Sequence, residues 1–198
     1  GFLGLPKSDE QDVSGVAGGK WNQFVGGNIY WSATTGAREM HGAILVKYLA
    51  LGPAAFGLPT TDETGVPGYA PGRKSELVGA TIYWSGATGA FEVHGAIRDK
   101  WLTMGGPAVF GMPTSDEQDV SGGAKWSQFQ GVNIYWSAAT GAREVHGAIL
   151  AKYIEYGGPA SALGLPTSDE YSSGSGRRSD FVGGYIYWDA SGGAQVVI

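Results

Sequence analysis

Gly27-Asn28-Ile29-Tyr30-Trp31 is the stretch that decides the fold, because its last three residues, Ile-Tyr-Trp, occur four times along the chain. The other copies end at Trp84, Trp136 and Trp188, so successive tryptophans lie 53, 52 and 52 residues apart. A period near fifty with an aromatic motif in every copy is typical of one supersecondary element that is repeated and stacked, since an element of this size cannot bury its apolar face alone. The sequence therefore predicts an internal repeat whose function is carried by surfaces, in several copies.

Further motifs accompany Ile-Tyr-Trp in each repeat. A Gly-x-Pro corner, which ends at Pro6, Pro59, Pro113 or Pro166, is followed by an acidic pair: Asp9-Glu10, Asp62-Glu63, Asp116-Glu117 or Asp169-Glu170. After Ile-Tyr-Trp, the motif Glu-x-His-Gly-Ala-Ile occurs three times, at His41, His94 and His146. We divide the chain into four repeats, residues 1–52, 53–105, 106–157 and 158–198, and expect them to form a single domain.

Composition limits the class of protein. The 35 glycines stand at fixed places in each repeat, so they mark turns and not disorder. No apolar run approaches the roughly 20 residues that span a bilayer, so we expect no membrane insertion. The net charge of −5, without a basic stripe, argues against nucleic acid as the partner. The absence of cysteine excludes disulfides and thiolate metal sites.

Periodicity within one repeat predicts strands followed by a helix. Residues 20–25 and 28–31 form two β-rich runs, joined by a pair of glycines expected to take the positive φ of a hairpin turn. Residues 37–40 form a third strand. From Gly42 the apolar spacing becomes helical, and the helix is expected to end at Gly52-Pro53. The predicted fold class is an α+β repeat, with four short β-meanders and linking helices in a ring-like, propeller-resembling or curved arrangement.

Comparison of the copies separates core from surface. Two positions are apolar in every repeat and are predicted to be buried: Phe24, Leu77, Phe129 and Phe181, and Ile29, Ile82, Ile134 and Ile186. Strand alternation places Trp21 on the face opposite Phe24, where the other copies carry Lys74, Trp126 and Arg178. A position that accepts Lys or Arg contacts water. Trp21 and Trp126 are therefore candidate platforms that stack on sugar rings or cations, and packing under a loop is the alternative.

Other residues have weaker functional interpretations. Tyr30, Tyr83, Tyr135 and Tyr187 are secondary ligand-binding candidates and are expected to be partly exposed, although a role in packing would equally explain a tyrosine in every copy. Arg38 and Arg143 vary between copies and are candidates for tuning ligand choice. The histidines and acidic pairs are expected to be structural, with no metal or cofactor. Each candidate catalytic residue recurs in a quasi-symmetric repeat, so we expect no enzyme.

Repeats 1 and 3 resemble each other more closely than neighbours do, because residues 8–15 and 115–122 have the same sequence. A two-repeat block was therefore duplicated. If binding depends on the tryptophan-bearing repeats, two stronger and two altered sites are expected, and two weak sites on one chain gain avidity toward a repetitive ligand.

The order of these motifs resembles the LGFP repeat family over essentially the whole chain, with Leu5, Leu58, Met112 or Leu165 in place of the family's phenylalanine. The resemblance implies a secreted or wall-associated module that binds carbohydrate or cell-wall polysaccharide, as in the cell-envelope enzymes of actinobacteria that carry such repeats. Replacement of both Trp21 and Trp126 by alanine is then predicted to abolish glycan binding without unfolding the chain. A scaffold for a protein partner and a self-assembling structural protein, for example a homodimer, are the alternatives.

Overall fold

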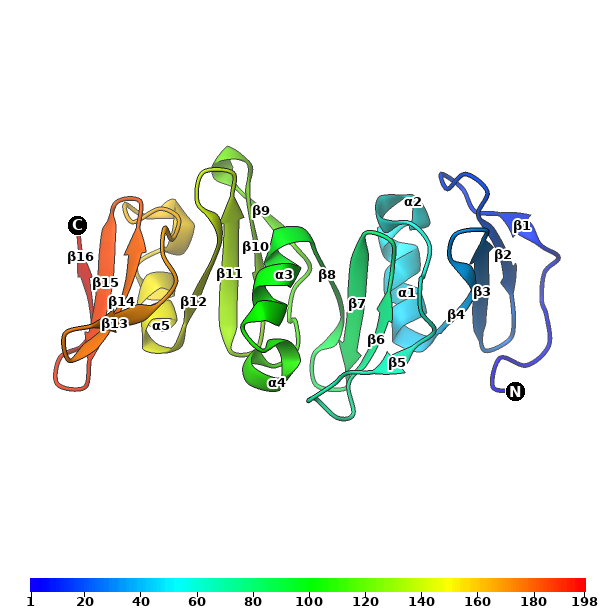
Figure 1. The fold of residues 1–198 in the computed structure, drawn as a ribbon, viewed down its shortest axis with the longest axis horizontal. Coiled ribbons are helices and arrows are strands. Elements are labelled where there is room, and N and C mark those ends of the chain that lie inside the picture. The colour runs from blue at the N-terminus through cyan, green and yellow to red at the C-terminus, as the bar shows by residue number, and fades with distance from the viewer. The chain divides into compact units, whose positions relative to one another are not determined.

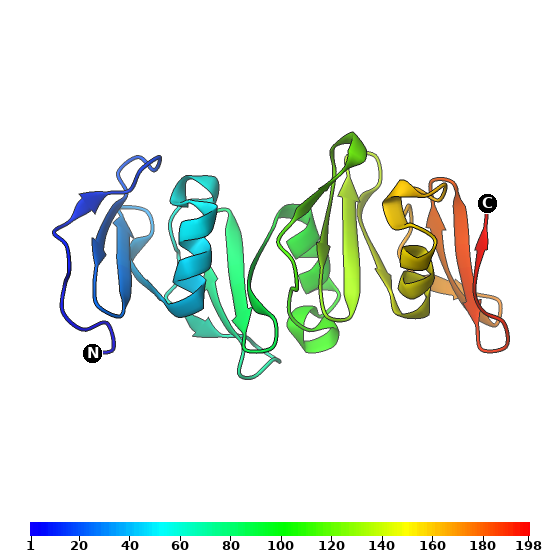
Figure 2. The ribbon, with the colours of Figure 1, turned by 180° about the vertical axis from the view of Figure 1, so that it is seen from behind.

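The computed structural model describes all residues from 1 to 198. It divides into two compact units, an N-terminal unit over Gly1–Gly95 and a C-terminal unit over Ala96–Ile198. Each unit contains two four-stranded sheets. Figure 1 and Figure 2 show helix α1 (Gly42–Leu51) between the sheets of the N-terminal unit and α5 (Gly147–Glu155) between those of the C-terminal unit. No helix is long and apolar enough to cross a membrane.

In repeats 1 to 3 a short strand and three longer strands are followed by a helix, and a short helical turn then leads into the next repeat. In repeat 4 the four strands are the last elements. The elements of the N-terminal unit are β1 (Gln11–Asp12), β2 (Lys20–Gln23), β3 (Gly27–Ser32), β4 (Gly36–His41), α1 (Gly42–Leu51), α2 (Pro53–Phe56), β5 (Thr64–Gly65), β6 (Arg73–Glu76), β7 (Ala80–Ser85) and β8 (Gly89–His94). The C-terminal unit comprises α3 (Gly95–Thr103), which begins at the boundary residue, α4 (Gly106–Phe110), β9 (Gln118–Val120), η1 (Ser121–Gly123), β10 (Ala124–Gln128), β11 (Val132–Ser137), β12 (Gly141–His146), α5 (Gly147–Glu155), η2 (Gly158–Ala160), β13 (Tyr171–Ser173), β14 (Gly176–Phe181), β15 (Gly184–Asp189) and β16 (Gly193–Val197).

Each sheet is an antiparallel meander in which the strands lie in sequence order. The sequence predicts three strands and a helix per repeat, so the α+β repeat is confirmed, but the number of strands is wrong. The additional strands β1, β5, β9 and β13 are two or three residues long and mostly polar. Such a segment carries no apolar alternation, which is why periodicity does not reveal it.

The helix of one repeat also packs against the sheet of the next repeat. Helix α1 contacts β3 and β4 of its own repeat and β7 and β8 of the following one, and α5 likewise contacts β11, β12, β15 and β16. The predicted apolar side of the helix is confirmed, since Ile44 and Tyr48 of α1 are buried, as are Ile149 and Tyr153 of α5. The helix ends as expected at Gly52, whose N–H donates to Tyr48 O at 3.0 Å.

The core of each unit fills the space between its two sheets. In the C-terminal unit the buried cluster consists of Tyr135, Val145, Ile149, Tyr153, Leu163, Phe181 and Ile186. The predicted core positions are confirmed as buried in repeats 2, 3 and 4, whereas Phe24 and Ile29 of repeat 1 are only partly buried. In the C-terminal unit, the ring of Trp101 on α3 stacks on Phe129 with centroids 4.6 Å apart, so sheet β9–β12 is covered on both faces.

The paired glycines between the second and third strands differ from the prediction. Neither Gly26 nor Gly27 has a positive φ. A Cβ on Gly26 would lie 2.4 Å from Phe2 O, and one on Gly27 would lie 2.5 Å from Met40 O. Glycine is therefore required here because neighbouring backbone approaches closely, and not because the turn needs a left-handed conformation.

Candidate functional site

The residues predicted to bind a ligand lie in one row across each sheet. In sheet β9–β12, Trp126 pairs with Tyr135 on β11, and Tyr135 pairs with Arg143 on β12. The same row in sheet β1–β4 consists of Trp21, Tyr30 and Arg38. Directly paired residues project from the same face of a sheet. The structure therefore brings together the three predicted residues of each tryptophan-bearing repeat.

The aromatic rings of this row form a layered contact with the following helix. The ring of Trp126 is nearly parallel to that of Tyr135, with an interplanar angle of 10° and centroids 5.8 Å apart. On its other side Tyr135 meets Tyr153 of α5 edge-on, at 5.5 Å. Trp21, Tyr30 and Tyr48 repeat both contacts in the N-terminal unit. Trp126 thus stands at the margin of the core, with its indole partly buried.

The expected partial exposure of the tyrosines is wrong in three of four repeats. Tyr30 is 2% exposed, and Tyr83 and Tyr135 are each 3% exposed. In repeats 1 and 3 the reason is the helix, which covers the face that strand alternation assigns to these side chains. Burial raises the pKa of Tyr135, and a hydrogen bond from Asn133 lowers it in part. Tyr187 is partly exposed, as expected.

The two arginines stabilise turns. Arg38 Nε donates to Thr35 O at 3.1 Å, and Arg143 Nε donates to Thr140 O at 3.0 Å. Both carbonyls belong to the turn between the third and fourth strands, where Gly36 and Gly141 have positive φ values of 69° and 68°. Arg143 also lies 3.9 Å from Asp169 Oδ2. These contacts hold the turn in place, and ligand tuning by the arginines stays a prediction.

A cavity of about 640 Å³ opens over the aromatic row of repeat 3. Its floor includes Trp126, Gln128, Asn133 and Tyr135, so two of the predicted ligand-binding residues line it. One wall is the end of β9 and the start of η1, with Val120 and Ser121, and the other is the end of α5 together with Gly157, Gly158 and Pro159. This volume lies within the range of about 300–1,000 Å³ that small-molecule sites occupy.

The polar groups of this cavity carry little free charge. Asp119 is its one lining carboxylate, and Lys125 Nζ donates to Asp119 Oδ1. That hydrogen bond raises the pKa of Lys125. On the floor, Asn133 Nδ2 donates to Tyr135 Oη at 3.2 Å. An aromatic surface beside amide groups is suited to a neutral ligand that has both an apolar face and hydroxyl groups.

A second large cavity, of about 590 Å³, lies in the N-terminal unit beside Trp31. Trp31 is 44% exposed and was not among the predicted site residues. The loop with Val16 and Gly18, the turn with Thr34 and Thr35, and Leu58 also line it. Sequence comparison did not select Trp31 because the tryptophan of Ile-Tyr-Trp is present in all four copies, which is equally typical of a packing residue.

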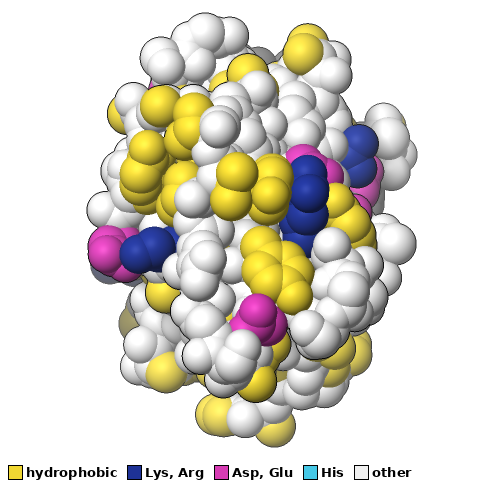
Figure 3. Space-filling model, turned by 90° about the vertical axis from the view of Figure 1, so that its left-hand side faces the viewer, with side chains coloured by type: hydrophobic (Ala, Val, Ile, Leu, Met, Phe, Trp, Pro, Cys, Tyr) yellow, Lys and Arg dark blue, Asp and Glu magenta, His cyan; other side chains and the backbone are white.

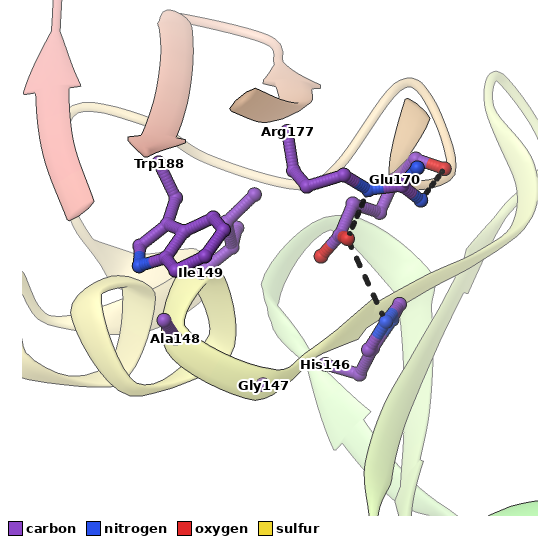
Figure 4. A pocket seen from close by; sticks show the side chains of 7 residues that line it. All are labelled: His146, Gly147, Ala148, Ile149, Glu170, Arg177 and Trp188. Atoms are coloured by element: carbon purple, nitrogen blue, oxygen red, sulfur yellow. Dashed lines mark hydrogen bonds and ion pairs between the residues drawn. The ribbon is translucent and has the colours of Figure 1, made fainter. Parts of the chain in front are cut away.

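Two small pockets, each of about 180 Å³, occur at equivalent places in the two units. Figure 4 shows the one in the C-terminal unit, where Glu170 lies between Arg177 and His146 and the ring of Trp188 lies over the start of α5. Arg177 Nε donates to Glu170 Oε1 at 2.7 Å, and His146 Nε2 lies 3.7 Å from the same oxygen. The second pocket contains the corresponding residues His41, Glu63 and Trp84.

These pockets explain the conspicuous histidines and acidic pairs. His146 Nδ1 lies 2.6 Å from Glu144 Oε2, and this hydrogen bond raises the pKa of His146. Asp169 Oδ1 accepts from the backbone N–H of Glu144 at 3.2 Å, and Asp62 Oδ1 accepts in the same way from Glu39 at 3.0 Å. In repeats 2 and 4 the acidic pair therefore bonds to the preceding repeat, which is a structural role of the kind expected. No group of three or more His, Cys, Asp or Glu residues is arranged to hold a metal ion.

Four four-stranded sheets and their intervening helices define an α+β repeat protein. The LGFP repeat family model matches residues 3–55, 56–108, 110–161 and 163–198, so the chain belongs to the LGFP repeat family. A comparison with curated protein sequences found no match.

Proposed function

We propose that this chain is a non-catalytic carbohydrate-binding repeat module, in which a sugar ring stacks on the indole of Trp126. The observation that carries the proposal is the cavity of about 640 Å³, because it joins an aromatic surface to the amide side chains of Gln128 and Asn133. The apolar face of a pyranose ring packs on an indole, and its hydroxyls need donors and acceptors at the edge of the ring.

The charge of the site favours a neutral sugar. Lys125 pairs with Asp119, the one carboxylate of the cavity, so the two charges offset each other, and the other residues that line the cavity are uncharged. Each candidate catalytic residue recurs in a quasi-symmetric repeat, which supports binding without catalysis.

Membership of the LGFP family extends the proposal to the cellular setting. The resemblance described above implies wall polysaccharide as the ligand and a secreted or wall-associated location. Repetition supports several sites on one chain, because a polymer with a repeating sugar unit engages them together and gains avidity. A ring-like or curved arrangement of the four repeats would present those sites to one polymer, and small-angle scattering of the chain in solution would test that arrangement.

The direct test is a glycan-array screen with the labelled protein, followed by titration of each positive glycan against intrinsic fluorescence. We expect Trp126→Ala to weaken binding by at least about tenfold, equivalent to ~1.4 kcal/mol, because the stacking surface is removed. Trp31→Ala tests the other large cavity and is expected to leave binding unchanged. If binding survives in Trp126→Ala but is lost in Trp31→Ala, the binding site is the cavity beside Trp31. If an array that includes wall polysaccharides shows no binding, the proposed function is refuted.

One observation favours a second candidate, a surface for a protein partner or a second copy of the chain. In sheet β13–β16, Tyr171 and Val197 are each 40% exposed, and the guanidinium of Arg178 lies 3.6 Å from the ring centroid of Tyr185. Figure 3 shows hydrophobic side chains gathered with few charged ones on the side of the molecule where this sheet lies. Light scattering over a range of concentrations tests it, and a concentration-independent monomer would count against self-assembly.

A further inference from the structure

Repeats 1 and 3 carry the same aromatic row but differ in the lengths of two segments beside it. Between the first and second strands, residues 12–21 of repeat 1 correspond to residues 119–126 of repeat 3, which is two residues shorter. After the helix, Gly52-Pro53 corresponds to Gly157-Gly158-Pro159, which is one glycine longer. Both differences fall on the segments that form the walls of the cavity in repeat 3.

In repeat 1 these two segments touch. A Cβ on Gly15 would lie only 2.6 Å from Ala54 Cβ, which places the loop directly against the segment after α1. Val13 of the same loop is 5% exposed, and Val16 packs with Trp21 against the buried cluster of the N-terminal unit. Hydrogen bonds from Val16 N to Val13 O and from Gly19 N to Val16 O, both at 3.1 Å, fix the loop in this position.

In repeat 3 the same segments stand apart. A Cβ on Gly122 or Gly123 would meet no heavy atom within 4 Å, and Ser121 is exposed. Val120 and Ser121 line one side of the cavity, while Gly157 and Gly158 line the other. The shorter loop no longer reaches the segment after the helix, and the additional glycine lengthens that segment. The two segments beside the aromatic row are therefore separated by a cavity in repeat 3 and in contact with each other in repeat 1.

Asn133 on the cavity floor has an unmet hydrogen-bonding requirement. Its side chain is 2% exposed, and Nδ2 donates to Tyr135 Oη, but Oδ1 is shielded from bulk water and has no partner. A buried acceptor without a donor is unfavourable, and such groups are rare in native proteins. Asn28 makes the same bond to Tyr30 at 3.0 Å in repeat 1, so the Asn-Tyr pair itself is common to both repeats.

We infer that, of the two tryptophan-bearing repeats, repeat 3 alone binds ligand, and that the Asn133 side chain turns toward the cavity so that Oδ1, which is covered in the free chain, accepts a hydrogen bond from a hydroxyl of a neutral, ring-shaped polyol stacked on Trp126. The inference rests on the proposed carbohydrate-binding function and narrows it to one principal site with a specificity-determining residue. It narrows the expectation of two stronger sites, in the tryptophan-bearing repeats 1 and 3, to one.

The experiment uses the full chain labelled with 5-fluorotryptophan, whose seven ¹⁹F resonances are assigned with single Trp→Phe variants. The probes are methyl glycosides of glucose, galactose, mannose and arabinose and their single-deoxy derivatives. We expect the Trp126 resonance to shift on addition of at least one glycoside while that of Trp21 stays in place. Asn133→Leu is expected to weaken the binding of that glycoside about tenfold, and one deoxy derivative is expected to lose the same factor.

Two variants separate recognition from folding. Asn133→Leu removes an unpaired buried acceptor together with the donor to Tyr135 Oη, and Asn28→Leu removes the same donor to Tyr30 Oη. The thermal midpoint of Asn133→Leu is therefore expected to fall no further than that of Asn28→Leu, whereas a purely structural Asn133 would make it fall further. Asn28→Leu is the matched control and is expected to leave binding unchanged. Replacing residues 122–124 by the repeat 1 sequence Gly-Val-Ala-Gly-Gly is expected to abolish the ¹⁹F shift of Trp126, because the loop then closes the cavity.

The outcomes distinguish the two proposals. A glycoside-dependent shift of Trp21, or undiminished binding by Asn133→Leu, would overturn the inference while carbohydrate binding stands. If no resonance responds to any glycoside, the proposed function fails. The change in each ¹⁹F chemical shift between H₂O and D₂O then still tests the open site, because it reports how far water reaches each tryptophan ring. This change should be larger for Trp126 than for Trp21, and that of Trp126 should fall in the loop-replacement variant. Equal changes for the two tryptophans would overturn the inference.

Discussion

The backbone N–H of Glu170 donates a hydrogen bond to Glu144 Oε1 at 2.8 Å, which joins repeat 4 to repeat 3. The second oxygen of the same carboxylate contacts His146 Nδ1 at 2.6 Å. In the N-terminal unit, Glu39 makes the same two contacts, with the N–H of Glu63 at 3.1 Å and with His41 at 2.8 Å. At each of these two junctions, within one unit, a single carboxylate thus fixes the following acidic pair against the preceding strand.

Removal of this carboxylate should destabilise the junction. Glu144 is almost fully buried, so Glu144→Ala leaves the N–H of Glu170 without its acceptor and is expected to lower the free energy of unfolding by about 2–4 kcal/mol. Glu144→Gln keeps an acceptor for that N–H and should recover part of the loss. Urea unfolding measures both, with the exposed Glu155→Ala as control, expected to change stability by less than about 0.5 kcal/mol. Equal effects of the Ala and Gln variants would contradict a role for the hydrogen bond.

Stability should depend on pH through His146. Its pKa is raised, first by the hydrogen bond to Glu144 and further by the charges of Glu144 and Glu170, while burial and Arg177 lower it. A raised pKa in the folded state means that protonated His146 stabilises the fold. This contribution is fully present below about 6.5, the pKa of an unfolded histidine, and is lost as the pH rises through the folded-state pKa.

The variant His146→Gln isolates this contribution, because the other histidines cancel in the comparison with the native chain. We expect the native chain to exceed the variant in thermal midpoint by the largest margin near pH 5.5, and the margin to shrink toward pH 8. Differential scanning fluorimetry across that range measures it. A margin independent of pH, or one that grows with pH, would contradict the assignment.

The repeated elements could be predicted because each position of the repeat occurs in several copies along the chain, which can be compared with one another. Ile82, Ile134 and Ile186 are apolar in every copy and prove to be buried, and the helical spacing that includes Ile149 and Tyr153 correctly identifies the buried side of α5. Trp126 was selected because its counterparts Lys74 and Arg178 require contact with water, and it lies on the floor of the largest cavity described above.

The cavity itself could not be predicted from these patterns. It depends on two small length differences, the shorter loop after Val120 and the additional Gly158, which matter only because the fold places these segments opposite each other. Strand alternation assigns Tyr135 to the face of Trp126 but does not reveal that Tyr153 covers it. The spacing of Glu144 and His146, repeated at Glu39 and His41, is the signal in the sequence that marks the junction.

The buried hydroxyl of Tyr153 should contribute measurably to stability. Tyr153 Oη donates to Gly164 O at 2.7 Å, and burial raises the pKa of the phenol, so it stays a neutral donor. Tyr153→Phe leaves that carbonyl without this partner and is expected to cost about 1–2 kcal/mol of unfolding free energy. Tyr48→Phe, which loses the equivalent bond to Gly57, should cost a similar amount. Chemical denaturation measures these free energies, with Tyr156→Phe, at an exposed tyrosine, as control. If Tyr156→Phe lowers the free energy of unfolding by as much as Tyr153→Phe does, the cost does not come from the buried hydrogen bond.

The close backbone approach at the paired glycines predicts different costs at equivalent positions. A Cβ on Gly183 would lie 1.9 Å from Ala162 O, whereas one on the equivalent Gly131 would lie 3.4 Å from Phe110 O. Neither glycine has a positive φ, so backbone strain does not distinguish the two alanine variants. They differ in the space that is available to the added Cβ. Gly183→Ala must displace the Leu163 segment, which is held by the bond from Gly183 N to Leu163 O at 2.9 Å, and is expected to cost about 1–3 kcal/mol. Gly131→Ala should change stability by less than about 0.5 kcal/mol. Thermal unfolding of the two variants decides the matter, since similar midpoints would mean that these glycines are required for the turn conformation and not for backbone approach.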